Sequence, residues 1–195
     1  MRRILVAYST NAGSTAEVAQ AVRENLEGPD TAVEVKRIGE VRELGGYSAV
    51  VVGAPMIVGW HRQAARFVRR RRKELSRVPV ALFFTAMQVT QAGGEQGFGF
   101  PVLLDPGVLR QPARPGRLSF KERQTTVASY LKPIAGALAE IRPAGAVFFT
   151  GKLGYGRLAF PQMLFVMLVI GARPGDSRDW ELIASWARGI GKEIA

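Results

Sequence analysis

Short apolar runs without a charged residue alternate along this chain with segments of helical periodicity, and this alternation constrains the fold more than any other feature. Residues 4–8, 49–53, 80–85 and 146–150 are typical of strands buried on both faces. Residues 32–38 alternate between apolar and charged side chains and predict an edge strand. Apolar residues at helical spacing predict helices over 15–26, 64–75, 126–141 and 180–194. The pattern predicts an α/β fold, a doubly wound parallel sheet of five strands with helices on both faces.

Two segments interrupt this alternation. Residues 88–124 contain six glycines and four prolines without sustained periodicity, and predict a long loop inserted into a single domain of 1–195. Residues 158–172 form an apolar stretch between two arginines that is shorter than the roughly 20 residues of a membrane-spanning helix. We interpret this stretch either as a buried crossover helix or as a flap that faces a membrane or a quinone.

Two residue types set limits on the chemistry. The chain has no cysteine, which excludes disulfides, iron–sulfur clusters, cysteine-ligated zinc and a cysteine nucleophile. Its single histidine, His61, excludes a site built from several histidines, and no metal is expected.

The charge balance predicts an acidic counterpart. Lysine and arginine number 27 against 16 aspartates and glutamates, a net charge of +11. Eight of these cations lie between residues 62 and 77: Arg62, Arg66, Arg69, Arg70, Arg71, Arg72, Lys73 and Arg77. No nucleic-acid-binding motif accompanies them, so we expect an anionic membrane surface or an acidic small molecule as partner, and no nucleic acid. A solvated face without a partner is the simpler alternative.

The first residues predict where the protein resides. Two arginines precede a short apolar run, but the run stops at Ser9, short of the apolar core of about 7–15 residues that a signal peptide needs. We therefore expect a cytoplasmic protein that associates peripherally with the inner face of the cell membrane.

The turn after the first strand has the composition of a phosphate site. It joins a buried strand directly to a helix, where backbone N–H groups and the helix dipole favour an anion, and its hydroxyls add further donors. The predicted phosphate loop consists of Ser9, Thr10, Asn11, Ala12, Gly13, Ser14 and Thr15. It lacks the lysine of a Walker loop and the three glycines of a dinucleotide fingerprint, which favours one phosphate monoester. A capped helix start with incidental hydroxyls is the alternative.

These residues resemble a known family. Ser9, Thr10, Gly13 and Thr15 after the first strand resemble the FMN phosphate loop of flavodoxins, and the order of strands and helices is similar to the flavodoxin-like fold, with strand order 2-1-3-4-5. The resemblance is closest to the menaquinone-dependent protoporphyrinogen IX dehydrogenases. It extends to Tyr8 before the loop and to residues 53–61, 150–155 and 175–180.

The resemblance implies FMN as cofactor and a site at the carboxyl ends of the strands. The loops after the third and fourth strands would flank the flavin ring, with these residues: Pro55, Met56, Ile57, Val58, Gly59, Trp60, Thr85, Ala86 and Met87. Trp60 would stack on the flavin or cover the next helix, and His61 would lie near the flavin or only begin that helix. No catalytic side chain is predicted, because the flavin supplies the redox chemistry.

The activity implied is oxidation of protoporphyrinogen IX, with menaquinone as electron acceptor. Basic residues near the site would pair with the carboxylates of a porphyrinogen-type reductant. Three alternatives stay open: an electron-transfer flavodoxin, an NAD(P)H:quinone reductase of flavodoxin-like fold, and a non-enzymatic basic scaffold or nucleic-acid binder that has lost its flavin. A carrier usually docks through an acidic surface, and the basic charge of this chain disfavours that alternative.

Overall fold

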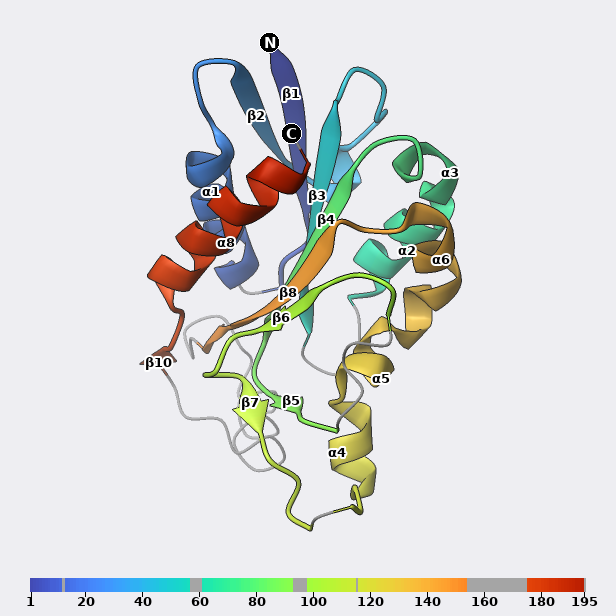
Figure 1. Ribbon diagram of the computed structural model, residues 1–195, viewed down its shortest axis with the longest axis vertical. Helices are drawn as coiled ribbons and strands as arrows, with labels where there is room; N and C mark the ends of the chain where they lie inside the picture. The colour runs from blue at the N-terminus through green and yellow to red at the C-terminus, as the bar shows by residue number, and fades with distance from the viewer. Residues whose placement is uncertain (12, 57–60, 93–97, 115, 154–174, 195) are drawn as a thin grey trace.

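The computed structural model describes residues 1–11, 13–56, 61–92, 98–114, 116–153 and 175–194 (Figure 1). Its centre is a sheet of six parallel strands in the order β2-β1-β3-β4-β8-β6. These strands are β1 (Arg2–Tyr8), β2 (Thr31–Arg37), β3 (Ala49–Met56), β4 (Val80–Ala86), β6 (Val102–Leu104) and β8 (Gly145–Thr150). The first five strands in that order match the predicted order 2-1-3-4-5, which is confirmed. The predicted number of strands was wrong by one, because β6 extends the sheet beyond β8.

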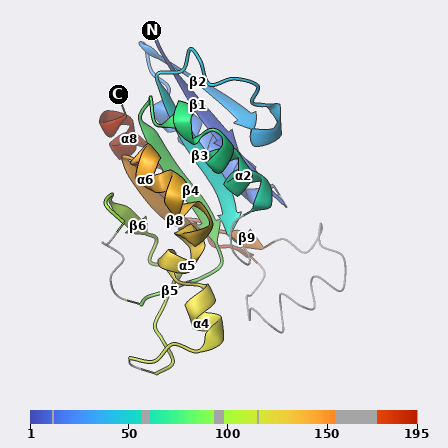
Figure 2. The same ribbon diagram turned by 90° about the vertical axis from the view of Figure 1, so that its right-hand side faces the viewer.

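Alternating side chains of the strands supply two hydrophobic cores, one on each face of the sheet. Ile4, Val6 and Phe83 point to a core closed by α1 (Ser14–Leu26) and α8 (Trp180–Glu193). Leu5, Val50, Phe84 and their neighbours point to the opposite core, under α2 (Arg62–Arg70), α3 (Arg72–Leu75), α5 (Val127–Leu131) and α6 (Ala135–Ile141). Figures 1 and 2 show these two groups of helices on opposite sides of the sheet.

Two predicted helices are divided in the structure. Residues 64–75 form α2 and α3, which meet at Arg71. Residues 126–141 form α5, the 3₁₀ turn η2 (Lys132–Ile134) and α6. Pro133 lies in that turn and has no N–H for a helical hydrogen bond, which explains the division. A second short 3₁₀ turn, η1 (Ile38–Glu40), follows β2.

The inserted segment 88–124 is not the irregular loop that its composition predicts. Besides β6 it contains β5 (Val89–Thr90), β7 (Leu109–Arg110) and α4 (Phe120–Gln124), and β5 pairs with β7 in a small sheet of its own. The segment 158–172 lies outside the described residues. The strands on either side of it, β9 (Lys152–Leu153) and β10 (Gly175–Asp176), pair antiparallel.

A buried carboxylate attaches the inserted segment to the sheet. Asp105 is 3% exposed, and its oxygens accept hydrogen bonds from the Thr150 amide at 2.8 Å, the Thr150 hydroxyl at 2.6 Å and the Gly107 amide at 2.7 Å. These bonds join the end of β6 to the end of β8. The hydrogen bonds of Asp105 therefore lie at the carboxyl edge of the sheet, where ligands bind in folds of this type.

Asp105→Ala is expected to lower the free energy of unfolding by about 2–4 kcal/mol, because it leaves the two buried donors of Thr150 and the Gly107 amide without their acceptor. Urea denaturation followed by circular dichroism measures the change. The exposed carboxylate of Glu43 provides the control, for which Glu43→Ala should change stability by no more than about 0.5 kcal/mol. Equal stability of the two variants would show that Asp105 does not hold the insertion.

Candidate functional site

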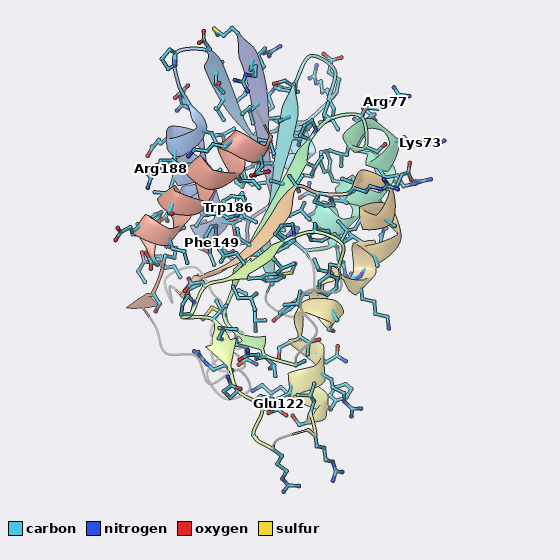
Figure 3. All side chains as sticks on the ribbon, in the orientation of Figure 1. Lys73, Arg77, Glu122, Phe149, Trp186 and Arg188 are labelled. Carbon is cyan, nitrogen blue, oxygen red and sulfur yellow. The ribbon has the colours of Figure 1, made fainter. Side chains whose placement is uncertain are left out.

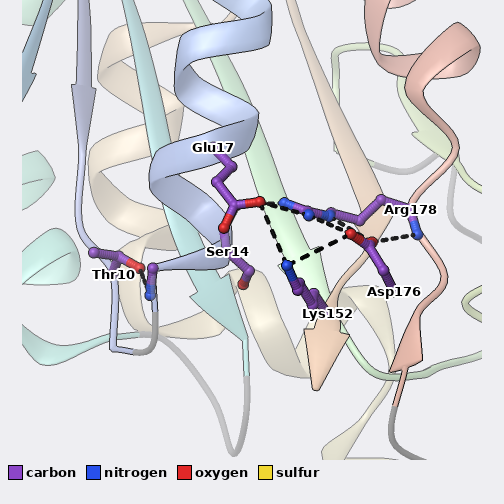
Figure 4. Close-up of polar contacts among 7 residues, drawn as sticks. Thr10, Ser14, Glu17, Lys152, Asp176 and Arg178 are labelled. Atoms are coloured by element: carbon purple, nitrogen blue, oxygen red, sulfur yellow. Dashed lines mark hydrogen bonds and ion pairs between the residues drawn. The ribbon is translucent and has the colours of Figure 1, made fainter. Parts of the chain in front are cut away.

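The loop between β1 and α1 lies at the carboxyl edge of the sheet, beside the end of β3. The Ser9 amide donates to the Gly53 carbonyl at 3.0 Å, which continues the pairing of β1 with β3 by one residue. The Gly13 amide then donates to the Thr10 hydroxyl oxygen at 2.9 Å and closes a tight turn (Figure 4). Gly13 has a φ of 95°, in the left-handed region that favours glycine. The single glycine of the predicted loop is therefore required by the turn that starts α1.

The first turn of α1 presents free donors. The backbone amides of Ala16 and Glu17 donate to the Gly13 carbonyl, whereas the amides of Ser14 and Thr15 have no acceptor among the described residues. Unpaired amides at a helix N-terminus, together with the helix dipole, attract an anion. The geometry thus agrees with the phosphate-binding role predicted for this loop.

Ser9 provides a test of fit. Ser9 is 4% exposed, and its hydroxyl oxygen is buried without a hydrogen-bond partner among the described residues. Buried hydroxyls in folded proteins are nearly always paired, so this oxygen requires a partner that the described part of the chain does not supply. A phosphate oxygen accepting from this hydroxyl would meet the requirement, and the residues present fit the phosphate of FMN.

The fold brings Thr15 and Thr85 together. Thr15 was predicted for the phosphate loop, and Thr85 for the flavin side of the site. Their hydroxyl oxygens are 2.9 Å apart, and both side chains are buried. This bond joins the first turn of α1 to β4 at the carboxyl edge of the sheet. The Thr15 hydroxyl is therefore engaged with Thr85, and the Ser9 hydroxyl is the better-placed free donor for a phosphate.

The loops predicted to flank the flavin converge on the same edge. Pro55 and Met56 end β3, Ala86 ends β4, and all three are buried. The amide of Gly151, which follows β8, donates a hydrogen bond to the Ala86 carbonyl at 2.9 Å. Met87, the residue after Ala86, is half-buried. Asn11 is exposed on the phosphate loop. The predicted residues Ala12, Ile57, Val58, Gly59 and Trp60 lie outside the described residues.

Two further groups border this edge. His61 occupies the N-cap position of α2, and its Nδ1 is buried without a partner among the described residues. Burial lowers the pKa of His61, which favours the neutral form of its imidazole. The Tyr130 hydroxyl donates to the Gln88 carbonyl at 3.1 Å and fixes the start of the chain after β4. Burial raises the pKa of Tyr130 to about 12, which keeps this donor protonated.

A cluster of charged residues that sequence reasoning missed lies against the phosphate loop. Arg178 contacts Glu17 of α1 and Asp176 of β10, and Lys152 of β9 lies 3.8 Å from both carboxylates (Figure 4). The Arg178 guanidinium also donates to the Ser14 carbonyl at 3.3 Å. No local pattern reveals this cluster, because Glu17 and Arg178 are 161 positions apart.

Comparisons with known proteins agree with this geometry. The family model described as Flavodoxin domain matches residues 5–176. A flavodiiron protein from Giardia intestinalis has a similar fold, with 9% identity, a TM-score of 0.52, and coverage of 100% of this chain and 36% of that one. A mutant flavodoxin from Pseudomonas aeruginosa has 9% identity, a TM-score of 0.50 and 98% coverage of both chains. Among curated proteins no match is found.

The match to the family model runs from Leu5 in β1 to Asp176 in β10, and so includes nearly all of the central sheet. The two structural likenesses show the fold alone. FMN, the cofactor that the resemblance to flavodoxins implies, is confirmed by the family to which the matched domain belongs. The chain is therefore a member of the flavodoxin domain family, with FMN as its cofactor.

Proposed function

We propose that this protein is an FMN-dependent oxidoreductase that oxidises a porphyrinogen-type acidic molecule and passes the electrons to menaquinone at a membrane. This activity is the one implied by the resemblance of the sequence to the menaquinone-dependent protoporphyrinogen IX dehydrogenases. Bound FMN supplies the electron-transfer chemistry. The chain holds the phosphate through Ser9 and the amides of Ser14 and Thr15, and shapes the flavin side with the ends of β3 and β4.

The observation that supports this proposal is the positive charge of the chain, +11 overall. An acidic substrate and an anionic lipid surface both complement that charge, whereas basic docking sites on redox proteins do not. Electron-carrying flavodoxin is therefore the second candidate, and its support is the family itself.

The basic cluster of residues 62–77 divides into two groups. Arg69, Arg71 and Arg72 have partners within the chain: the Pro133 carbonyl at 3.2 Å, Glu74 at 2.9 Å and Glu140 at 3.0 Å. The remaining members are exposed and have no ion pair with any described residue: Arg62, Arg66, Arg70, Lys73 and Arg77. Figure 3 shows Lys73 and Arg77 projecting away from the molecule. We call these five residues the free basic face.

Turnover distinguishes the candidate functions. With FMN-loaded protein, we expect protoporphyrin to form from protoporphyrinogen IX under anaerobic conditions only when a menaquinone analogue is present. Porphyrin absorbance measures the product. Electron uptake from a flavodoxin reductase, with no porphyrin formed, would favour the carrier. Oxidation of NAD(P)H by the quinone without porphyrinogen would favour an NAD(P)H:quinone reductase instead.

The free basic face predicts binding to anionic vesicles. No helix in the described part of the chain is long and apolar enough to cross a membrane. Each basic residue near an anionic surface contributes roughly 1 kcal/mol, so replacing four should weaken vesicle binding on the order of a thousandfold. The variant changes Arg66, Arg70, Lys73 and Arg77 to glutamine, and co-sedimentation with phosphatidylglycerol vesicles at low salt measures the loss.

A matched variant separates the free basic face from net charge. It replaces four exposed cations on other elements with glutamine: Arg2, Arg37, Arg117 and Lys192. This control should bind the vesicles more tightly than the test variant, and high salt should release both. Equal binding of the two variants would assign the attraction to overall charge and would remove the support for a specific membrane face.

A further inference from the structure

Arg178 is a buried cation next to the cofactor loop. Its side chain is 1% exposed, yet its guanidinium is paired on several sides. Nε donates to Asp176 Oδ1 at 2.7 Å, and Nη2 contacts both Asp176 Oδ2 and Glu17 Oε2, the latter at 2.6 Å. Nη1 donates to the Ser14 carbonyl at 3.3 Å. A planar group with several fixed donors is well suited to hold such separate acceptors in one arrangement.

These contacts join three parts of the chain. Ser14 and Glu17 belong to the first turn of α1, Asp176 belongs to β10, and Lys152 of β9 lies opposite Asp176 in the antiparallel pair. Figure 4 shows Arg178 and Lys152 between the carboxylates of Glu17 and Asp176. The same side chain therefore fixes the helix turn that presents the Ser14 and Thr15 amides and the strand pair beside it.

Charge gives this arrangement a second effect. Glu17 places a carboxylate in the first turn of α1, where it would repel the phosphate of FMN. Arg178 and Lys152 balance Glu17 and Asp176, so the cluster carries no net charge. The pKa of Asp176 is lowered to about 2, chiefly by the hydrogen bond from Arg178, and the balance therefore persists at neutral pH.

We propose that Arg178 is a positioning residue for FMN: it holds the first turn of α1, neutralises Glu17, and couples cofactor binding to the pairing of β9 with β10. The proposal rests on the FMN cofactor and not on the identity of the substrate or the quinone. Coupling of this kind is reciprocal, so FMN should stabilise the β9–β10 pair as much as the pair stabilises bound FMN.

Fluorescence titration of apoprotein with FMN tests the charge effect with two variants, one that removes the cation Arg178 and one that removes the anion Glu17. Arg178→Gln leaves Glu17 without its closest cation and should weaken FMN binding by about tenfold or more. Glu17→Gln removes the repulsion while Arg178 keeps Asp176 and Ser14, and should bind FMN at least as tightly as the parent. A merely structural role predicts weaker binding in both variants and would overturn the proposal.

Two further variants complete the design. Arg178→Lys retains the charge but not the planar group, and should recover part of the affinity that Arg178→Gln loses. Arg188→Gln is the control: Arg188 of α8 also bonds to α1, through Asn25 at 2.8 Å, but away from the phosphate loop. It should leave FMN affinity unchanged. A loss in Arg188→Gln equal to that in Arg178→Gln would assign the effect to general loosening of α1.

Hydrogen exchange of the parent protein tests the coupling without any substitution. Saturating FMN should slow exchange of the backbone amides in the β9–β10 pair, as well as those of the phosphate loop. Glu17→Gln should keep this response, and Arg178→Gln should lose it. Protection of the phosphate loop without any change in β9 and β10 would refute the coupling. These measurements require only FMN, so a failure of the porphyrinogen assay leaves their outcome intact.

Discussion

Gly53→Ala is expected to lower the free energy of unfolding by about 3 kcal/mol. A Cβ atom at this position would lie 2.1, 2.5 and 2.7 Å from three carbons of the Phe83 ring. Phe83 is fully buried and packs against Phe149 and Trp186, with ring centroids 6.4 Å away in each case. Figure 3 shows Phe149 and Trp186 side by side between β8 and α8. The ring packs against both of these side chains, so the methyl group must displace the Phe83 ring, β3 or α8.

Gly189→Ala supplies the matched control for this substitution. Gly189 lies in α8, and apart from the adjacent backbone of that helix no atom lies within 4 Å of the position its Cβ would occupy. Alanine is the better helix former, so this variant should gain about 0.5–1 kcal/mol. Urea denaturation measures the free energy of unfolding of both variants. A loss below about 1 kcal/mol for Gly53→Ala would show that the core beneath β3 accommodates the methyl group.

Gly53 also shows what the sequence can and cannot predict about the fold. The apolar run 49–53 predicts a buried strand, because this signal is local, and β3 confirms it. The need for glycine at its end comes from the ring of Phe83 on the neighbouring strand, a contact that no local pattern contains. The same reasoning explains the missed strand β6, which has three residues between Pro101 and Asp105 and is too short for a periodic signal.

The candidate site could be predicted in part. A buried strand, a hydroxyl-rich turn with one glycine and a helix follow one another directly, so residues 4–15 alone predict a phosphate-binding turn. The bond between Thr15 and Thr85 and the contacts of Arg178 join positions far apart in the chain, and were not predicted. Their partners depend on the register of the sheet and on the return of the chain at β10.

FMN is expected to bind on the order of a thousandfold more tightly than riboflavin. The two flavins differ only in the phosphate group, which the Ser9 hydroxyl and the amides of Ser14 and Thr15 are placed to bind. Each hydrogen bond to a charged group contributes about 1.5–3 kcal/mol, so two or three such bonds account for a preference of this size. Quenching of flavin fluorescence during titration of apoprotein measures both affinities under the same conditions.

Ser9→Ala tests which group carries that preference. Removing the hydroxyl deletes one donor to the phosphate and should weaken FMN binding by about tenfold, while riboflavin affinity stays unchanged. Thr10 is the harder case, because its hydroxyl already accepts from the Gly13 amide, and Thr10→Ala would alter the turn as well as any phosphate contact. If Ser9→Ala weakens both flavins equally, the buried hydroxyl supports the fold of the loop and does not contact phosphate. A selective loss for FMN would instead identify Ser9 as a phosphate ligand, because only that flavin carries the charge that the unpaired hydroxyl is placed to meet.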